Sequence, residues 1–330
     1  MSEDEWLTID QASDYSKLSR STLYQWTKDG RLAYQDQSRG GRLVSRAGLD
    51  QILSPVAHAS PEQAIERLIA GYERLLRESY QLVTDNPPKL DAVGKWVPFA
   101  IYGHLLRNGR ALHQLLTTGY VEEGRATARV MMAAALNVVA IVDADSDGRA
   151  LQFLAYQRPL RRKALDRLVA QGHLTQARRD AIDAAETDAE DKTLAGYAAA
   201  GITPLPIGKG QSTWHGLNDR DLAIRMKAER WYDIYYGPLS DMGAHANIAS
   251  LTGIVSEMLT GSFAIGPSRT DPVHIVMAAS EAVGEVTCQL ERHFALGKGA
   301  EAEAIHQRAQ QSILMHVHWS AFHGRVPATP

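Results

Sequence analysis

Cysteine is almost absent from this chain of 330 residues, because Cys288 is the only one, and an intrachain disulfide is therefore excluded. Chains with so little cysteine are typical of the reducing cytoplasm, where we expect this protein to lie. The acidic N-terminus lacks the basic start and the apolar core of a signal peptide. The longest nearly apolar run, residues 130–142, is interrupted by Asn137 and is too short to span a bilayer. We expect it to be a buried helix, and no membrane to be a partner.

A general excess of basic charge is missing as well. The formal net charge is −3 with histidine neutral, so any signal for nucleic-acid binding must be local. The hydrophobic fraction of 45% is large enough for a sizeable core and does not favour disorder. The length exceeds that of one average domain, which predicts at least two.

The chain divides at a short stretch that contains two prolines and two serines. Residues 1–54 form one compositional block, and residues 55–61 have no amphipathic period, which predicts a linker. Residues 62–330 show helical spacing and no extended alternation, so we expect an all-helical bundle there. One helix should run from residue 62 to the breaker Asp85-Asn86-Pro87-Pro88. Further helices are expected at about residues 92–118, 121–142, 147–171, 174–199, 219–236, 244–260, 271–296 and 300–322.

Two short helices joined by a tight turn are indicated near the N-terminus. Thr8 and Gln11 have the spacing of a capping box at the start of the first helix. Ser19 is placed to cap a second helix over about residues 20–29, and Gly30 suits the left-handed conformation that ends a helix. This order is the pattern of a helix-turn-helix, whose second helix lies in the major groove of DNA.

The second helix has an apolar side and a polar side. Leu23 and Trp26, three residues apart, should face a small core. Arginine can form two hydrogen bonds with guanine and glutamine two with adenine, while hydroxyls are versatile partners. The candidate DNA-binding residues here are Ser19, Arg20, Ser21, Thr22, Gln25 and Lys28.

A β-hairpin is expected to follow and to form a wing. Residues 32–34 and 42–44 have the texture of short strands, the glycine pair at residues 40–41 suits the turn, and residues 45–53 suit a last short helix. Arg39 and Arg42 would reach a minor groove or the flanking phosphates. Between Ser16 and Gly48 seven basic residues face two acids, a local charge of +5 that favours phosphate binding.

These motifs together carry a family resemblance. The segments are Trp6-Leu7-Thr8-Ile9-Asp10-Gln11-Ala12, Ser19-Arg20-Ser21-Thr22-Leu23-Tyr24-Gln25-Trp26, Gly30-Arg31-Leu32 and Gly41-Arg42-Leu43-Val44 before Leu49. Over about residues 6–53 the chain resembles the excisionase and MerR-like winged helix family, which implies binding to duplex DNA. Some excisionase-like domains bind protein partners instead, so a docking module is the alternative.

The C-terminal block carries a second resemblance. Its pattern is Trp214-His215-Gly216, then Tyr232-Asp233-Ile234-Tyr235, then Leu239-Ser240 followed by His245. Over about residues 95–295 it resembles a family of bacterial helical domains of unknown function, which implies an all-helical fold and no particular activity. Residues 125–135 carry alanine where we expect an acidic residue, so no active site is carried over.

The polar candidates in this block have ordinary structural interpretations. Ser240 is expected to cap a helix, and His245, four residues from Asp241, to be a buried, hydrogen-bonded histidine. His316 and His323 could share a helix face, but His318 points elsewhere and no cysteine completes a zinc set. We therefore expect no metal and no cofactor.

An enzymatic alternative rests on Arg107 and His113, whose spacing fits a ribonuclease of the HEPN type, as in toxins and phage-defence proteins. They would be its acid–base and phosphate-binding pair. Two other arginine–histidine pairs in the chain fit the same spacing, so the motif is not specific. Gly109 also weakens the helix on which the pair would lie.

The sequence favours a regulator of transcription that binds double-stranded DNA. We expect a homodimer, because one short helix and a wing bury little area on DNA and a second DNA-binding domain raises the affinity. The helical region would dimerise and could respond to a small-molecule or protein effector. Aromatic side chains on helices are usually core, but six could line an effector pocket: Trp96, Trp214, Trp231, Tyr232, Tyr235 and Tyr236.

Overall fold

The computed structural model describes residues 5–16, 18–36, 41–49, 52, 60–204, 213–239 and 272–323. Several sequence predictions lie outside these residues. They are the tip of the wing with Arg39, most of the linker, the helix expected at 244–260, and the candidates Ser240, Asp241 and His245.

The N-terminal part contains two helices and a small sheet. Its elements are β1 (Trp6–Thr8), α1 (Ile9–Ser16), α2 (Arg20–Lys28), β2 (Tyr34–Asp36) and β3 (Arg42–Ser45), and a further helix begins at Arg46. β3 lies between β1 and β2 and is antiparallel to both. The first two predicted helices and the second strand of the hairpin are confirmed. The first strand lies at 34–36 instead of 32–34, because the N–H groups of Arg31 and Leu32 still donate to the carbonyl of Trp26, and β1 was not predicted. One core unites these elements: Leu7, Ile9, Ala12, Leu18, Leu23, Trp26, Leu32, Val44 and Leu49.

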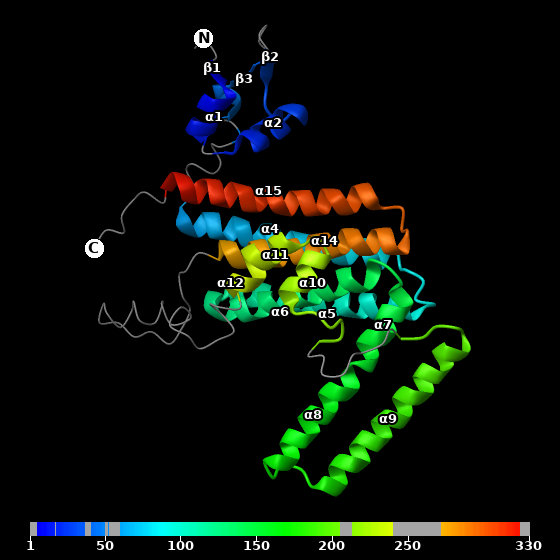
Figure 1. The fold of residues 1–330 in the computed structure, drawn as a ribbon. Coiled ribbons are helices and arrows are strands. Elements are labelled where there is room, and N and C mark those ends of the chain that lie inside the picture. The colour runs from blue at the N-terminus through cyan, green and yellow to red at the C-terminus, as the bar shows by residue number, and fades with distance from the viewer. Residues whose placement is uncertain are drawn as a thin grey trace, which may run out of the picture.

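The remaining described chain is helical (Figure 1). Its elements are α4 (Pro61–Asp85), α5 (Val93–Thr117), α6 (Val121–Val142), α7 (Ser146–Ala155), α8 (Gln157–Ala170), α9 (Gln176–Ala199), α10 (Asp219–Arg225), α11 (Glu229–Trp231), η1 (Tyr232–Tyr236, a π-helical turn), α12 (Gly237–Leu239), α14 (Val273–Phe294) and α15 (Gly299–His323).

Most predicted helices are confirmed to within two residues, and two are divided. The helix expected at 147–171 is broken between α7 and α8. Pro159 has no N–H to donate to the carbonyl of Ala155, so the hydrogen-bond ladder cannot continue through this point. The helix expected at 219–236 consists of α10, α11 and η1, with Lys227 in a left-handed conformation between the first two.

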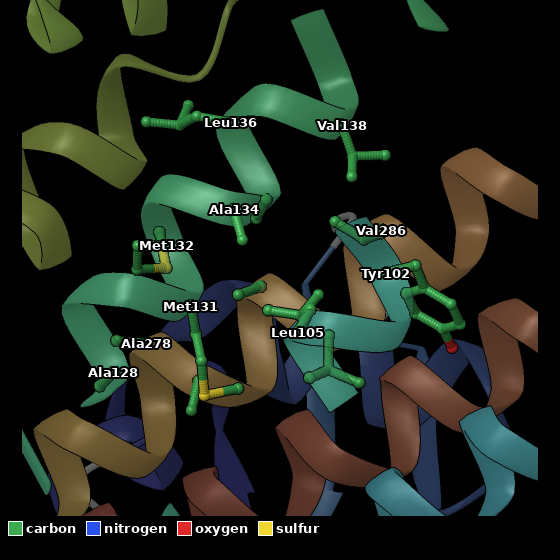
Figure 2. Packing of buried hydrophobic residues seen from close by; sticks show 14 of the residues in the cluster. Tyr102, Leu105, Ala128, Met131, Met132, Ala134, Leu136, Val138, Ala278 and Val286 are labelled. Carbon is green, nitrogen blue, oxygen red and sulfur yellow. The ribbon is translucent and has the colours of Figure 1, made fainter. Parts of the chain in front are cut away.

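The large core is built around α6, which packs against α5 and α14, while α4 and α15 pack against α14. Figure 2 shows Met131 and Ala128 of α6 beside Ala278 of α14, and Leu105 of α5 close by. By length and composition α6 could cross a membrane, but half of its most apolar 18-residue window is buried inside the protein. It is the core helix that the sequence predicted.

The start of α5 is held by groups from two other helices. Pro98 has no N–H for the carbonyl of Gly94, and His293 Nε2 of α14 donates to that oxygen instead, at 2.9 Å. The Gly94 N–H in turn donates to Asp147 Oδ1 of α7 at 2.6 Å. A Cβ atom at position 94 would lie 2.7 Å from the backbone nitrogen of Asp147, so only glycine allows this approach.

We therefore predict that Gly94→Ala lowers the free energy of unfolding by about 1–3 kcal/mol, because backbone atoms must move to admit the methyl group. Gly103→Ala on the same helix is the matched control. Position 103 has open space, so this change should raise stability by about 0.5–1 kcal/mol. Urea unfolding followed by circular dichroism measures both. Equal effects of the two substitutions would contradict the close approach.

An ion pair lies between α14 and α15. His306 Nε2 is 3.2 Å from Glu281 Oε2, and the imidazole covers Gly284, where a Cβ atom would lie 2.3 Å from His306 Cδ2. Burial lowers the pKa of His306, but hydrogen bonds with Cys288 and Glu281 outweigh it and raise this pKa to about 9. The folded protein therefore holds a proton here that the unfolded chain, with an ordinary pKa of 6.5, loses earlier.

Because the folded-state pKa is raised, the contribution of His306 to stability is complete below pH 6.5 and is lost as the pH rises towards 9. We predict that the stability of the native chain falls relative to His306→Gln across this interval. Urea midpoints of both proteins at pH 6 and pH 9.5 test it. An unchanged difference between the two midpoints would show that His306 gains no proton affinity on folding.

Candidate nucleic-acid interface

The orientation of α2 is set by burial on one side. Leu23 is fully buried and Trp26 is 4% exposed, and both belong to the small core, as the sequence predicted. Thr27 beside them is also buried. The opposite side of the helix, from Arg20 to Lys28, faces water. The side that carries the predicted DNA-binding residues is therefore accessible.

Capping fixes where both helices begin. The Thr8 N–H donates to Gln11 Oε1 at 2.9 Å and the Gln11 N–H to Thr8 Oγ1 at 3.2 Å, so the predicted capping box at α1 is confirmed. Ser19 Oγ accepts from the Thr22 N–H at 3.1 Å, which confirms the cap of α2. Gly30 ends this unit with φ +69°.

Three hydroxyls gather at the N-terminus of α2. Ser19 Oγ lies 2.7 Å from Ser21 Oγ and 2.8 Å from Thr22 Oγ1. The free N–H groups of a helix N-terminus and its positive dipole end attract phosphate, and hydroxyls add donors there. This end of α2 therefore has the chemistry to position a DNA backbone.

Two candidate base-reading side chains make weak contacts within the protein. Arg20 Nε is 2.7 Å from Asp10 Oδ1 of α1, with the two side chains 68% and 65% exposed. Gln25 Nε2 donates to Asp29 Oδ1 at 2.8 Å, and both groups are exposed. Exposed contacts of this kind contribute little to stability, so both side chains can exchange them for contacts with DNA.

Arg42 joins the wing to α2. Its guanidinium donates to Thr27 Oγ1 at 2.7 Å and to Asp36 Oδ1 at 3.3 Å. Its central carbon lies 4.2 Å from the ring centre of Tyr34 and 5.7 Å from that of Tyr24. The sequence assigned Arg42 to DNA alone, whereas the structure also gives it the task of holding β3 against the helix.

Tyr24 and Tyr34 are residues that the sequence interpretation missed. They are 48% and 41% exposed, and the centre of each ring lies within 5.7 Å of the central carbon of the Arg42 guanidinium, so two exposed aromatic rings stand beside one cation. The position of Tyr24 beside Gln25 was a signal for the first of them. For Tyr34 the local sequence carried no signal, because Tyr34 comes close to α2 only when the hairpin folds back towards that helix.

The alternative pair, Arg107 and His113, lies on α5. Arg107 is exposed, and His113 is half-buried with Nε2 3.9 Å from Glu73 Oε2. Six residues place the two side chains about 120° apart around the helix, so they leave it on different sides. Gly109 between them has a packing role, because Tyr72 and Leu76 of α4 fill the space of a Cβ atom. RNA cleavage stays a hypothesis from the sequence.

The aromatic residues proposed for an effector pocket are mostly core. Trp214, Trp231, Tyr235 and Tyr236 are buried, and Trp214 Nε1 donates to Asn137 Oδ1 of α6 at 2.7 Å. Trp214 and Trp231 line cavities of only 240 and 280 Å³. Within the described ranges no group of histidine, cysteine and acidic side chains could hold a metal ion, and His316 is buried against the carbonyl of Ala64.

Comparison with known families assigns both parts of the chain. Residues 6–54 match the profile of a helix-turn-helix domain, which agrees with the geometry of α1 and α2 and supports a DNA-binding role. Residues 95–261, half of the chain, match a family of unknown function (DUF5677). No curated protein and no solved structure was found to match the chain. The protein thus belongs to the DUF5677 family of unknown function, and its N-terminus carries a helix-turn-helix domain.

Proposed function

We propose that this protein binds specific sequences of double-stranded DNA and regulates transcription in the cytoplasm as a homodimer. The observation that carries the proposal is the exposed polar face of α2 in a domain that matches helix-turn-helix proteins. In this proposal residues 1–54 form the DNA-binding domain, residues 55–61 link it to the rest, and residues 62–330 form the domain that dimerises and receives an effector. We call residues 1–54 the DNA-binding head and propose that it is of the excisionase and MerR-like type.

The exposed polar face of α2 contains residues of two kinds, those that contact bases and those that contact phosphates. Arg20 and Gln25 are the readers of base edges, because their side chains match guanine and adenine. Ser19, Ser21 and Thr22 lie at the helix start, where backbone amides attract phosphate. Lys28 on α2 and the wing arginines Arg39 and Arg42 add positive charge that contacts the phosphates of the two DNA strands.

The strengths of the two interactions favour a move of the Arg20 side chain from Asp10 to a base of DNA. An exposed ion pair such as Arg20–Asp10 contributes about 0–1 kcal/mol. A bidentate contact between arginine and guanine favours guanine over the other bases by about 1–3 kcal/mol. Asp10 therefore holds Arg20 near its working position without competing strongly with a base.

The dimer surface that we propose is the helical pair α8 and α9, which projects from the other helices in Figure 1. Only Leu165 of α8 and Asp183 of α9 are buried in the two helices, and ion pairs between arginines and acids join them. Leu160, Ala164 and Leu168 recur every four residues on α8 and are exposed, which forms an unpartnered apolar stripe. A solitary helical pair with so little burial gains from a partner.

Charge favours a second copy as that partner. α8 has five cationic side chains and one acid, a net charge of +4, while α9 has six acids and three cations, a net charge of −3. A twofold axis sets α8 of one copy against α9 of the other, so a helix of net positive charge faces one of net negative charge twice. Part of this charge is already used within each copy, where Arg158 pairs with Glu190 and Arg162 with Asp183. On α9, Ala181, Ala185 and Ala189 are exposed at the same four-residue spacing and offer room for the leucines.

We predict that Arg20→Ala weakens binding to a duplex selected from a random library by about tenfold or more, and binding to random duplex much less. Gln25→Ala should act in the same way. Arg77→Ala, an exposed arginine of α4, is the matched control and should leave both affinities unchanged. Fluorescence anisotropy with labelled duplexes measures each value. Equal losses on selected and random DNA would remove Arg20 and Gln25 from base reading.

A second prediction concerns the dimer. Leu160→Asp and Leu168→Asp should convert the dimer to a monomer, since each places a charge in the apolar stripe. Ile224→Asp is the control, because Ile224 is similarly exposed on α10. Light scattering coupled to size-exclusion chromatography gives the mass. A dimer that persists in both leucine variants, or a monomeric native chain, would refute this surface.

A further inference from the structure

A cavity with a volume of about 680 Å³ lies between α4, the end of α5 and the start of α6. Its volume is that of a pocket for a small organic molecule. The floor is apolar and comes from elements that are distant in the sequence: Ile65, Ile69, Leu116, Val121 and Pro272. None of the aromatic residues that the sequence suggested lines it.

Three carboxylates stand at the same side of this cavity. Glu62, Glu66 and Glu73 lie on α4 within about 40° of one another around the helix axis. Among the described residues neither lysine nor arginine lines the cavity, and the one cationic candidate is His113, 3.9 Å from Glu73. The apolar floor thus meets a rim of negative charge, which attracts a cation and repels an anion.

We propose that this cavity binds an organic cation with an apolar body. Burial of the body against Ile65, Ile69 and Leu116 supplies the hydrophobic contribution, and the glutamates select the sign of the charge. A compact metal ion would leave the floor unfilled, and a neutral apolar molecule would gain nothing from the negative charge of the rim.

The place of the cavity connects it with the DNA-binding head. Pro61 and Glu62 line it, and they form the first turn of α4, so Pro61, the last residue of the predicted linker, already belongs to the helix. The Ser60–Gln63 capping box fixes that turn, and Ser60 Oγ also donates to Glu62 Oε2 at 2.9 Å. A bound cation therefore contacts the point where the linker enters the helical part. Its role as the effector rests on the proposed regulatory function, whereas its binding does not.

The test uses two ions of nearly equal shape and opposite charge, tetraphenylphosphonium and tetraphenylborate. Isothermal titration calorimetry of the full chain, without DNA, should show binding of the phosphonium and none of the borate. Glu66→Gln and Glu73→Gln should each weaken binding by about three- to tenfold, because each removes one carboxylate from the rim. Glu303→Gln on α15, far from the lining residues in sequence and exposed, is the control and should change nothing.

Two results would overturn the site: failure of the phosphonium to bind, or binding that none of the rim variants weakens. The effector role is tested separately, by measuring the affinity for the selected duplex with and without saturating phosphonium. A change of threefold or more supports this role, and an unchanged affinity overturns it while the site stands. A chain that binds no duplex even without the cation contradicts the proposed function and not the cavity.

Discussion

The burial of Leu23 and Trp26 is the constraint on which the candidate DNA-binding surface depends. Both side chains belong to a core to which the described part of the chain contributes nine buried residues, so α2 cannot rotate about its axis without exposing a tryptophan to water. With that side fixed, the hydroxyls, Arg20 and Gln25 must face outward. A hydrogen bond from Arg42 to Thr27 then ties β3 to the same helix, so β3 and the exposed polar face of α2 are held as one unit. Specific recognition needs this kind of preorganised pair of surfaces.

The helical part depends on a different core, which shares no residue with the first. α6 is buried among α5 and α14, and glycines allow the closest approaches, as at Gly94 beside α7 and Gly284 beneath His306. Polar groups freed by proline are satisfied from neighbouring helices, as His293 does for Gly94. Two cores that share no residue are consistent with the proposal that one part of the chain reads DNA while the other pairs and binds a ligand.

The sequence was sufficient to predict the features that depend on residues close to one another along the chain. The caps at Thr8 and Ser19, the left-handed Gly30 and the bounds of α5 and α6 follow from local patterns and are confirmed. It was insufficient where distant residues meet. β1 exists because it pairs with β3, and the contact of Arg42 with Thr27 depends on the folded hairpin. The rim of glutamates became a candidate site only when α5 and α6 supplied an apolar floor.

The most direct measurement is the affinity of the full chain for a random DNA duplex as a function of salt concentration. We expect measurable binding at low salt and a linear fall of the logarithm of the association constant with the logarithm of the salt concentration, because the net charge of +5 between residues 16 and 48 displaces counterions from phosphates. Absence of binding at low salt, or an affinity that does not change with salt, would contradict a DNA-binding head.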